Sequence, residues 1–255
     1  MKRTFAPLIA LSFLVAATSY GCSSSTDETP TGDAGADADS GKSDATTTTD
    51  AAKTDSGTTP TTCKPADVSK FVGGSYKGAK VAKACDAAQF VSMEKSWNGD
   101  TAEDEKWAGT ETVPSDCYKC AIGALTDATW APIFEDGTLN LAGCIERKEG
   151  TAAGKACASA LRDYQDCLSQ ACDTTCPIPE DSDDPGFEAA VAANDACVEA
   201  AACPKAVTDA FDSKCAFLDE PAGAAVSDLC YGPDQETFEQ ENTRWVNIVR
   251  LFCAK

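Results

Sequence analysis

Apolar residues recur at helical spacing over most of residues 63–255 of this chain. Where the periodicity is legible it follows the 3.6-residue repeat, and runs of alternating β-branched or aromatic residues, which are typical of strands, are missing. The pattern is clearest near the end, where Asp234 is the expected N-cap and one helix face carries Phe238, Trp245, Ile248, Val249 and Phe252. The sequence therefore predicts an all-α domain in which this face is buried.

A second clear helix is expected over residues 151–171. Its apolar stripe contains Cys157, Leu161, Tyr164, Leu168 and Cys172, and we expect Arg162, Asp163, Gln165 and Asp166 to face water. Cysteines at both ends of the stripe predict bridges to neighbouring helices. Weaker patterns indicate helices at 81–96, at 116–125 behind a Ser115 cap, at 141–148 behind Asn140, at 187–201, and from Pro204 through Val207, Phe211 and Phe217, giving six or seven in all.

The first 21 residues have the layout of a secretory signal segment. Lys2 and Arg3 precede an apolar stretch over residues 5–17, which is too short to span a bilayer as a helix. Ser19-Tyr20-Gly21-Cys22 resembles the lipobox of bacterial lipoproteins, in which the cysteine is acylated, although Ser19 and Tyr20 depart from the usual residues. The alternative is ordinary signal-peptidase cleavage after Gly21.

Two observations favour lipidation of Cys22. Residues 23–62 contain no aliphatic side chain larger than alanine and no aromatic one, so they cannot offset the entropy of ordering and are expected to form a disordered tether. Assigning Cys22 to a lipid also leaves an even number of cysteines, which can all pair. We therefore expect a signal peptide at 1–21, a lipidated tether at 22–62 and a cysteine-rich domain at 63–255.

Cysteine usage indicates an oxidising compartment. The chain has 15 cysteines, a density typical of exported, disulfide-bonded proteins. Their pairing cannot be deduced from sequence alone. The residues expected in disulfides are Cys63, Cys85, Cys117, Cys120, Cys144, Cys157, Cys167, Cys172, Cys176, Cys197, Cys203, Cys215, Cys230 and Cys253.

Charge and the absence of histidine exclude several functions. A formal net charge of -20 argues against nucleic acid as a partner, because phosphate binding relies on clustered lysine and arginine. The chain has no histidine, which removes Ser-His-Asp and Cys-His catalysis and histidine-ligated zinc. No cofactor, no metal and no catalytic residue is expected.

Two cysteine arrangements need separate consideration. Cys117 and Cys120 form a Cys-x-x-Cys motif, which can be redox-active at a helix N-terminus, but residues three apart on one helix face can equally bridge to different neighbours. A cysteine-only zinc or iron–sulfur site, for example Cys117, Cys120, Cys172 and Cys176, lacks a second paired spacing. The structural interpretation is preferred in both cases.

Tryptophans are the remaining candidates for binding. Trp130 and Trp245 are expected in the core, whereas Trp97 and Trp107 lie in polar surroundings and could line a carbohydrate or peptide site.

Residues 117–176 resemble the cysteine-rich lipoproteins found in numbers in myxobacterial genomes. The similarity is carried by Cys117-Tyr118-Lys119-Cys120, Trp130-Ala131-Pro132, Asn140-Leu141-Ala142-Gly143-Cys144, Cys157, Cys167, Cys172 and Cys176, and by the Thr/Asp/Gly-rich tether. It implies an envelope or surface location, brings no known activity and carries over no catalytic residue.

The leading hypothesis is a non-enzymatic lipoprotein of the outer membrane or cell surface. Its lipid would hold it on the membrane, and its rigid domain would bind an unidentified protein or carbohydrate or serve a structural interaction. A thiol-disulfide oxidoreductase using Cys117 and Cys120 is the first alternative, and a secreted inhibitor or effector is the second.

Overall fold

The computed structural model describes residues 63–179, 184–233 and 236–255. The expected signal peptide, Cys22 and the tether lie outside these ranges. The described chain is mostly helical, as predicted, and its elements follow in this order: α1 (Ala87–Trp97), the 3₁₀ turn η1 (Thr101–Glu103), α2 (Asp104–Ala108), α3 (Asp116–Ala121), β1 (Ile122–Gly123), β2 (Ile133–Phe134), α4 (Leu141–Glu149), α5 (Ala152–Cys172), α6 (Phe187–Ala200), α7 (Lys205–Cys215), η2 (Ala216–Asp219), α8 (Ala224–Cys230) and α9 (Phe238–Cys253).

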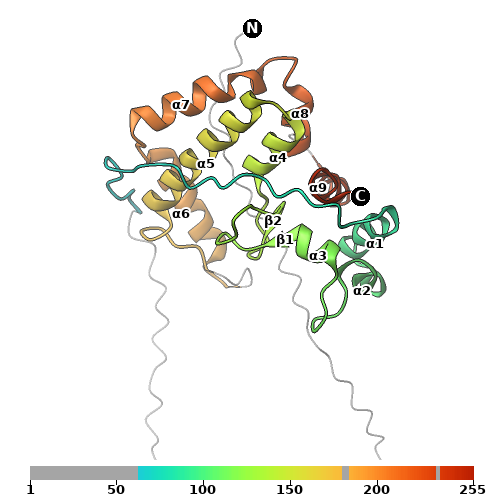
Figure 1. The fold of residues 1–255 in the computed structure, drawn as a ribbon. Helices are drawn as coiled ribbons and strands as arrows, with labels where there is room; N and C mark the ends of the chain where they lie inside the picture. The colour runs from blue at the N-terminus through green and yellow to red at the C-terminus, as the bar shows by residue number, and fades with distance from the viewer. Residues whose placement is uncertain (1–62, 180–183, 234–235) are drawn as a thin grey trace, which may run out of the picture.

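Helix α5 organises one half of the fold. Thr151 caps it, since its hydroxyl accepts a hydrogen bond from the Gly154 N–H. The apolar stripe of α5 is buried as predicted except at Tyr164, which is half-buried. Helices α4 and α7 pack along it, and α6 contacts it less extensively. Figure 1 shows α4, α5 and α7 side by side in the upper part of the molecule.

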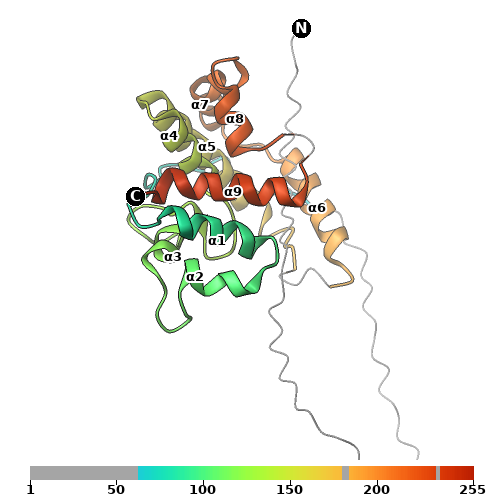
Figure 2. The same cartoon turned by 90° about the vertical axis from the view of Figure 1, so that its right-hand side faces the viewer.

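Helix α9 organises the other half. It lies between α1 and α3 on one side and α4 and α8 on the other (Figure 2). Its N-cap is Thr237, which forms a capping box with Gln240, so the expected cap at Asp234 is wrong, and Asp234 itself lies outside the described residues. Ile248, Val249 and Phe252 are buried as predicted, but Phe238 is 56% exposed because it stands in the first turn, before α9 meets its neighbours.

Two expectations near the start of the domain need correction. Residues 81–86 are extended rather than helical, because the N–H groups of Ala82, Ala84 and Cys85 donate to carbonyls at the end of α9 and the capping box of α1 begins at Asp86. Residues 122–125 do not continue α3. Instead β1 and β2 pair in parallel, with Ile122 opposite Ile133, which gives a short strand pair that no alternating pattern indicated.

Buried apolar side chains form two clusters. The main core gathers large side chains from α1, α4, α5 and α9, among them Phe90, Met93, Ile145, Leu161, Val246, Ile248, Val249 and Phe252. The second, which we call the satellite cluster, consists of Val68, Cys167, Ala171, Cys172, Cys176 and Cys197 at the far end of α5. Only one of its members, Val68, is larger than cysteine.

Within the described ranges, no helix combines the length and the apolar character that crossing a membrane would require.

Candidate functional site

Each of the fourteen cysteines in residues 63–255 is in a disulfide. The pairs are Cys63–Cys176, Cys85–Cys117, Cys120–Cys253, Cys144–Cys230, Cys157–Cys215, Cys167–Cys203 and Cys172–Cys197. Four of them fasten the main core and three fasten the satellite cluster. The prediction that the cysteines of α5 bridge to neighbouring helices is confirmed: Cys157 bonds α7, Cys172 bonds α6, and Cys167 bonds Cys203 in the connection between α6 and α7.

The Cys-x-x-Cys motif lies on α3 and does not form an internal disulfide. The Ser115 hydroxyl accepts from the Tyr118 N–H and caps the helix, as expected. Cys117 and Cys120 are fully or nearly fully buried and bond to different partners, Cys85 and Cys253. The pair therefore ties α3 to both the segment before α1 and the end of α9.

The four cysteines considered for a metal site do not come together. Cys117 and Cys120 are bonded as just described, whereas Cys172 and Cys176 belong to two disulfides of the satellite cluster. In the part of the chain that the structure describes, no three histidine, cysteine, aspartate or glutamate side chains are grouped so that they could hold a metal ion.

The suspected tryptophans belong to the packing of the fold. Trp107 is only 6% exposed, and the ring of Trp97 lies edge-on to both Trp107 and Trp245. Glu105 and Lys106, beside Trp107 in sequence, are exposed, whereas the Trp107 indole is buried. The expected binding surface is therefore wrong for Trp107. Trp97 is half-buried against the main core, as is Trp245, and Trp130 is buried as predicted.

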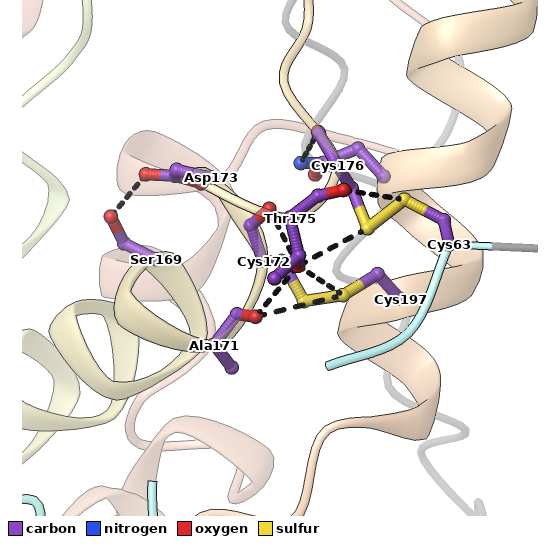
Figure 3. The surroundings of a disulfide bond; sticks show 9 residues. Cys63, Ser169, Ala171, Cys172, Asp173, Thr175, Cys176 and Cys197 are labelled. Atoms are coloured by element: carbon purple, nitrogen blue, oxygen red, sulfur yellow. Dashed lines mark hydrogen bonds between the residues drawn. A yellow bond between two sulfur atoms is a disulfide. The ribbon is translucent and has the colours of Figure 1, made fainter. Parts of the chain in front are cut away.

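Figure 3 shows the Cys63–Cys176 disulfide beside Cys172–Cys197, with Thr175 between them. The Thr175 hydroxyl donates to the Ala171 carbonyl at 3.1 Å, which extends the end of α5 toward both bridges. Cys176 is 3% exposed and Cys63 is half-buried. Cys63–Cys176 and Cys167–Cys203 are the two disulfides in which one cysteine is only half-buried.

An extended segment that we call the strap, residues 64–84, crosses α5 and α4 and ends beside α9 (Figure 1). Disulfides fasten the residues on either side of it, Cys63 to Cys176 and Cys85 to Cys117. Between Val68 and Cys85 the strap has no buried residue. It is held by polar contacts, by its two covalent ends and by half-buried apolar side chains, among them Tyr76, Ala79 and Ala82, that pack on the edge of the main core.

Acidic side chains of α5 and α4 accept hydrogen bonds from the strap. The Gly74 N–H donates to Asp163 at 2.6 Å, and the Ser75 hydroxyl donates to Asp166. Glu146 accepts from the Tyr76 hydroxyl and, at 3.0 Å, from the Ala79 N–H. The expectation that this face of α5 is turned to water is thus wrong, because the strap covers it.

The aromatic centre of this region is Trp130. Tyr76 packs edge-on against it with ring centroids 5.6 Å apart, and the Arg162 guanidinium lies over the indole, 4.9 Å from its centroid. Burial, and then the hydrogen bond to Glu146 with its negative charge, raise the pKa of Tyr76 well above its usual range. The phenol therefore stays a hydrogen-bond donor at all physiological pH values.

Two small hollows open beside the strap. One, of about 270 Å³, is lined by Asp67, Val68, Lys70, Phe71, Val72 and Gln170. The other, of about 300 Å³, lies between α4 and the start of α5, where Glu146, Arg147, Gly150, Thr151, Ala152 and Lys155 line it. Neither encloses a deep site. The polar contacts of the strap lie on a surface of α4 and α5 beside Trp130, which we call the groove.

We name that groove by its residues: Glu146, Asp163, Asp166, Arg162 and the edge of Trp130. None of these was singled out from the sequence as a site. The one sequence signal for the strap is Gly73-Gly74-Ser75-Tyr76, which breaks helical periodicity soon after Cys63.

This chain has no match among protein-family models, curated proteins or solved structures.

Proposed function

We propose that this protein is an exported lipoprotein, anchored through Cys22, whose disulfide-bonded helical domain is presented on a tether for binding or structural interaction. The observation that carries the proposal is the pairing of the cysteines. All fourteen cysteines of the domain are used in seven internal disulfides. Cys22 is left without a partner in the chain, as a lipid-modified residue would be.

Two further features support this role. Seven disulfides indicate that the domain forms in an oxidising compartment outside the cytosol. They also give a domain that resists proteolysis and heat, because each typically contributes about 2–4 kcal/mol. Such a domain suits exposure on an envelope. The resemblance to cysteine-rich myxobacterial lipoproteins, and placement on the outer membrane or cell surface, belong to the same proposal.

Thiol-disulfide exchange at Cys117 and Cys120 is a weaker proposal. It requires the two sulfurs to bond to each other in one redox state. Here each is bonded to a different partner and both are buried. No observation favours a secreted inhibitor or effector over a tethered binding domain.

Acylation is tested by growing cells that express the protein with radioactive palmitate. We expect label in the wild type and in Ser24→Ala, a matched neighbouring change, and none in Cys22→Ser. Label that persists in Cys22→Ser, or is absent from the wild type, would overturn the anchor. Thiol labelling of the denatured mature protein is the second readout, and it would contradict the proposal if most domain cysteines reacted.

A further inference from the structure

We propose that residues 74–80 of the strap occupy, in cis, a binding groove for an extended, lysine-bearing peptide of a partner protein, and that the Cys63–Cys176 disulfide controls access to this groove. The inference deepens the proposed binding role and rests on it. It does not depend on acylation of Cys22.

The groove recognises peptide backbone. The Lys80 N–H donates to the Trp130 carbonyl at 2.7 Å, and the Trp130 N–H donates to the Gly78 carbonyl at 2.9 Å, so Ala79 forms an isolated parallel bridge with Trp130. Addition of an extended peptide to exposed backbone is a recurrent mode of peptide binding, in which the main chain supplies affinity and side-chain positions supply specificity.

Acceptor groups of the groove determine which side chains of the bound segment are favoured. Two positions take hydroxyl donors, Ser75 on Asp166 and Tyr76 on Glu146. The next two polar positions take lysines: Lys77 donates to the carbonyls of Leu125 and Thr126, each at 3.1 Å. Lys80 donates to the carbonyl of Lys119 at 2.6 Å. The arrangement selects hydroxyl and ammonium donors and offers carboxylate and carbonyl acceptors.

Close approach adds a shape requirement. A Cβ at position 73 would lie 2.2 Å from the Asp163 carboxyl carbon, so a larger residue there would have to displace the carboxylate that accepts from the Gly74 N–H. Gly78 has a φ of +86°, a conformation that residues with side chains rarely adopt. A ligand therefore needs small residues on both sides of its hydroxyl-bearing pair.

Charge favours a basic partner over a second copy of this chain. Acidic residues outnumber lysine and arginine by 41 to 21, so two copies repel one another. Three carboxylates line the groove against one guanidinium. The carboxylates of the groove would attract a lysine-bearing segment of a less acidic protein. A second copy of this chain would be repelled by its overall negative charge.

Opening of the strap exposes only half-buried apolar side chains, because Tyr76, Ala79, Ala82 and Ala84 pack on the edge of the main core and no residue between Val68 and Cys85 is fully buried. A segment with few fully buried contacts is expected to open locally at a lower cost than the helices. The disulfide to Cys176 opposes this by holding the entering end in place. Cys63 is partly exposed, and access of a thiolate to one of the two sulfurs is the first requirement for exchange.

The opening step is a thiol-disulfide exchange with an envelope dithiol as reductant. One reductant thiolate attacks Cys63 and releases the Cys176 thiolate, and the second reductant thiol then displaces Cys63. The Cys63–Cys176 bond is reduced by two electrons and takes up two protons. The dithiol becomes an intramolecular disulfide.

The test supplies the strap in trans while weakening it in cis. The probe is a fluorescein-labelled peptide of residues 72–82. The loosened variant is the full-length chain with Cys63→Ala, Cys176→Ala, Ser75→Ala and Tyr76→Ala. It keeps the residues of the groove but lacks the Cys63–Cys176 disulfide and two hydroxyls of the strap. A weakened strap is needed because a tethered competitor acts at an effective concentration of about millimolar.

We expect the peptide to bind the loosened variant at least about tenfold more tightly than the disulfide-bonded wild type, measured by fluorescence anisotropy. A matched groove variant, adding Asp163→Asn and Glu146→Gln, should lose that gain. Equal binding to wild type and loosened variant would overturn the proposal. A loosened variant that dimerises on size-exclusion chromatography without peptide would overturn the choice of a basic partner in favour of a second copy.

A second measurement needs no substitution and covers failure of the variant to fold. The wild type is exposed to low dithiothreitol, alkylated, and digested briefly with trypsin. Cys63 and Cys176 should be alkylated first, and cleavage should then occur after Lys77 and Lys83. First alkylation at Cys167 and Cys203, or a strap that resists trypsin after Cys63 is labelled, would overturn control by this disulfide.

Discussion

The two buried clusters of this domain are stabilised in different ways. The main core combines four disulfides with large side chains such as Met93, Ile145 and Phe252. The satellite cluster has three disulfides but, apart from Val68, no buried side chain larger than cysteine. Helix α6 illustrates the difference, because Cys197 is its only buried residue. In the satellite cluster the disulfides replace a hydrophobic core, whereas in the main core they supplement one.

The difference follows from the sequence of each region. Residues 187–200 contain six alanines, one cysteine and only three larger apolar residues, Phe187, Val191 and Val198, and alanine buries little apolar area. A region that cannot bury enough surface needs covalent links to be stable, just as small secreted domains do. We therefore expect the main core to be more sensitive to changes in side-chain packing and the satellite cluster to be more sensitive to loss of a disulfide.

The largest expected effect comes from truncating the main core. Phe252 is 1% exposed and lies on α9 between both halves of the fold. Phe252→Ala should reduce the free energy of unfolding by about 3–5 kcal/mol, because it removes the ring and leaves a cavity. Val68→Ala, the matched change in the satellite cluster, should cost about 1–2 kcal/mol. Urea unfolding measures the free energy of unfolding of both variants. Equal losses would mean that packing stabilises the two clusters to the same extent.

Removing one disulfide from either cluster should reduce the free energy of unfolding by about 2–4 kcal/mol. The two variants should differ in which helices lose protection from hydrogen exchange. In Cys172→Ala/Cys197→Ala we expect the amides of α6 to exchange rapidly while those of α9 stay protected. In Cys144→Ala/Cys230→Ala we expect protection to fall across α4, α8 and α9, because that bridge lies inside the main core. Hydrogen exchange by mass spectrometry separates the two patterns. Global loss in the first variant would show that the satellite cluster supports the whole fold.

Much of this fold was predictable, because local signals decided it. Ser115, Asn140 and Thr151 each accept a hydrogen bond from the backbone N–H three residues on. Ser115 and Asn140 are the caps that the sequence predicts, and Thr151, expected as the first helical residue, is the cap one position before α5. The predicted helix at 81–96 began too early because tertiary hydrogen bonds to the end of α9 hold residues 82–85 extended. Helices α2 and α8 are too short for their periodicity to be visible.

The strap and its groove were not predictable for a related reason. Asp163 and Asp166 look like the solvent face of an amphipathic helix, and nothing local indicates that Gly74 and Ser75 lie on them, 89 and 91 residues apart in sequence. The disulfide pairing was beyond sequence as well, since it depends on which helices meet. The separate partners of Cys117 and Cys120 agree with the preferred structural interpretation of that motif, since residues three apart on one helix face can each bridge to a different neighbour.

A smaller effect is expected at Asn140, a buried polar residue beside the main core. It is 2% exposed, its amide donates to the Ala131 carbonyl at 2.9 Å, and its oxygen accepts from the Gly143 N–H at 2.8 Å. Asn140→Ala should cost about 2 kcal/mol, because it leaves a buried carbonyl and a helix-end N–H without partners. Thr151→Ala, at the more exposed cap of α5, should cost about half as much. Thermal unfolding of the two variants checks the order.

The smallest expected effect is a difference in acid sensitivity between the two clusters. Glu103 accepts a hydrogen bond from Lys106 at 2.9 Å and lies 3.7 Å from Lys95, and these contacts, the Lys106 hydrogen bond first, hold its pKa below the usual 4.5. Its folded pKa is below its unfolded one, so its contribution to stability is complete above pH 4.5 and is lost as the pH falls through the lower value. Disulfides do not titrate, so acid should loosen α1 and α2 before it loosens α6.

Hydrogen exchange at pH 5 and pH 3 tests this order. Glu103→Gln is expected to reduce the change in amide protection of α1 and α2 between the two pH values, and Glu105→Gln, at an exposed carboxylate, is expected to leave that change as it is in the wild type. Earlier loosening of α6 in acid would mean that charges, rather than disulfides alone, hold the satellite cluster.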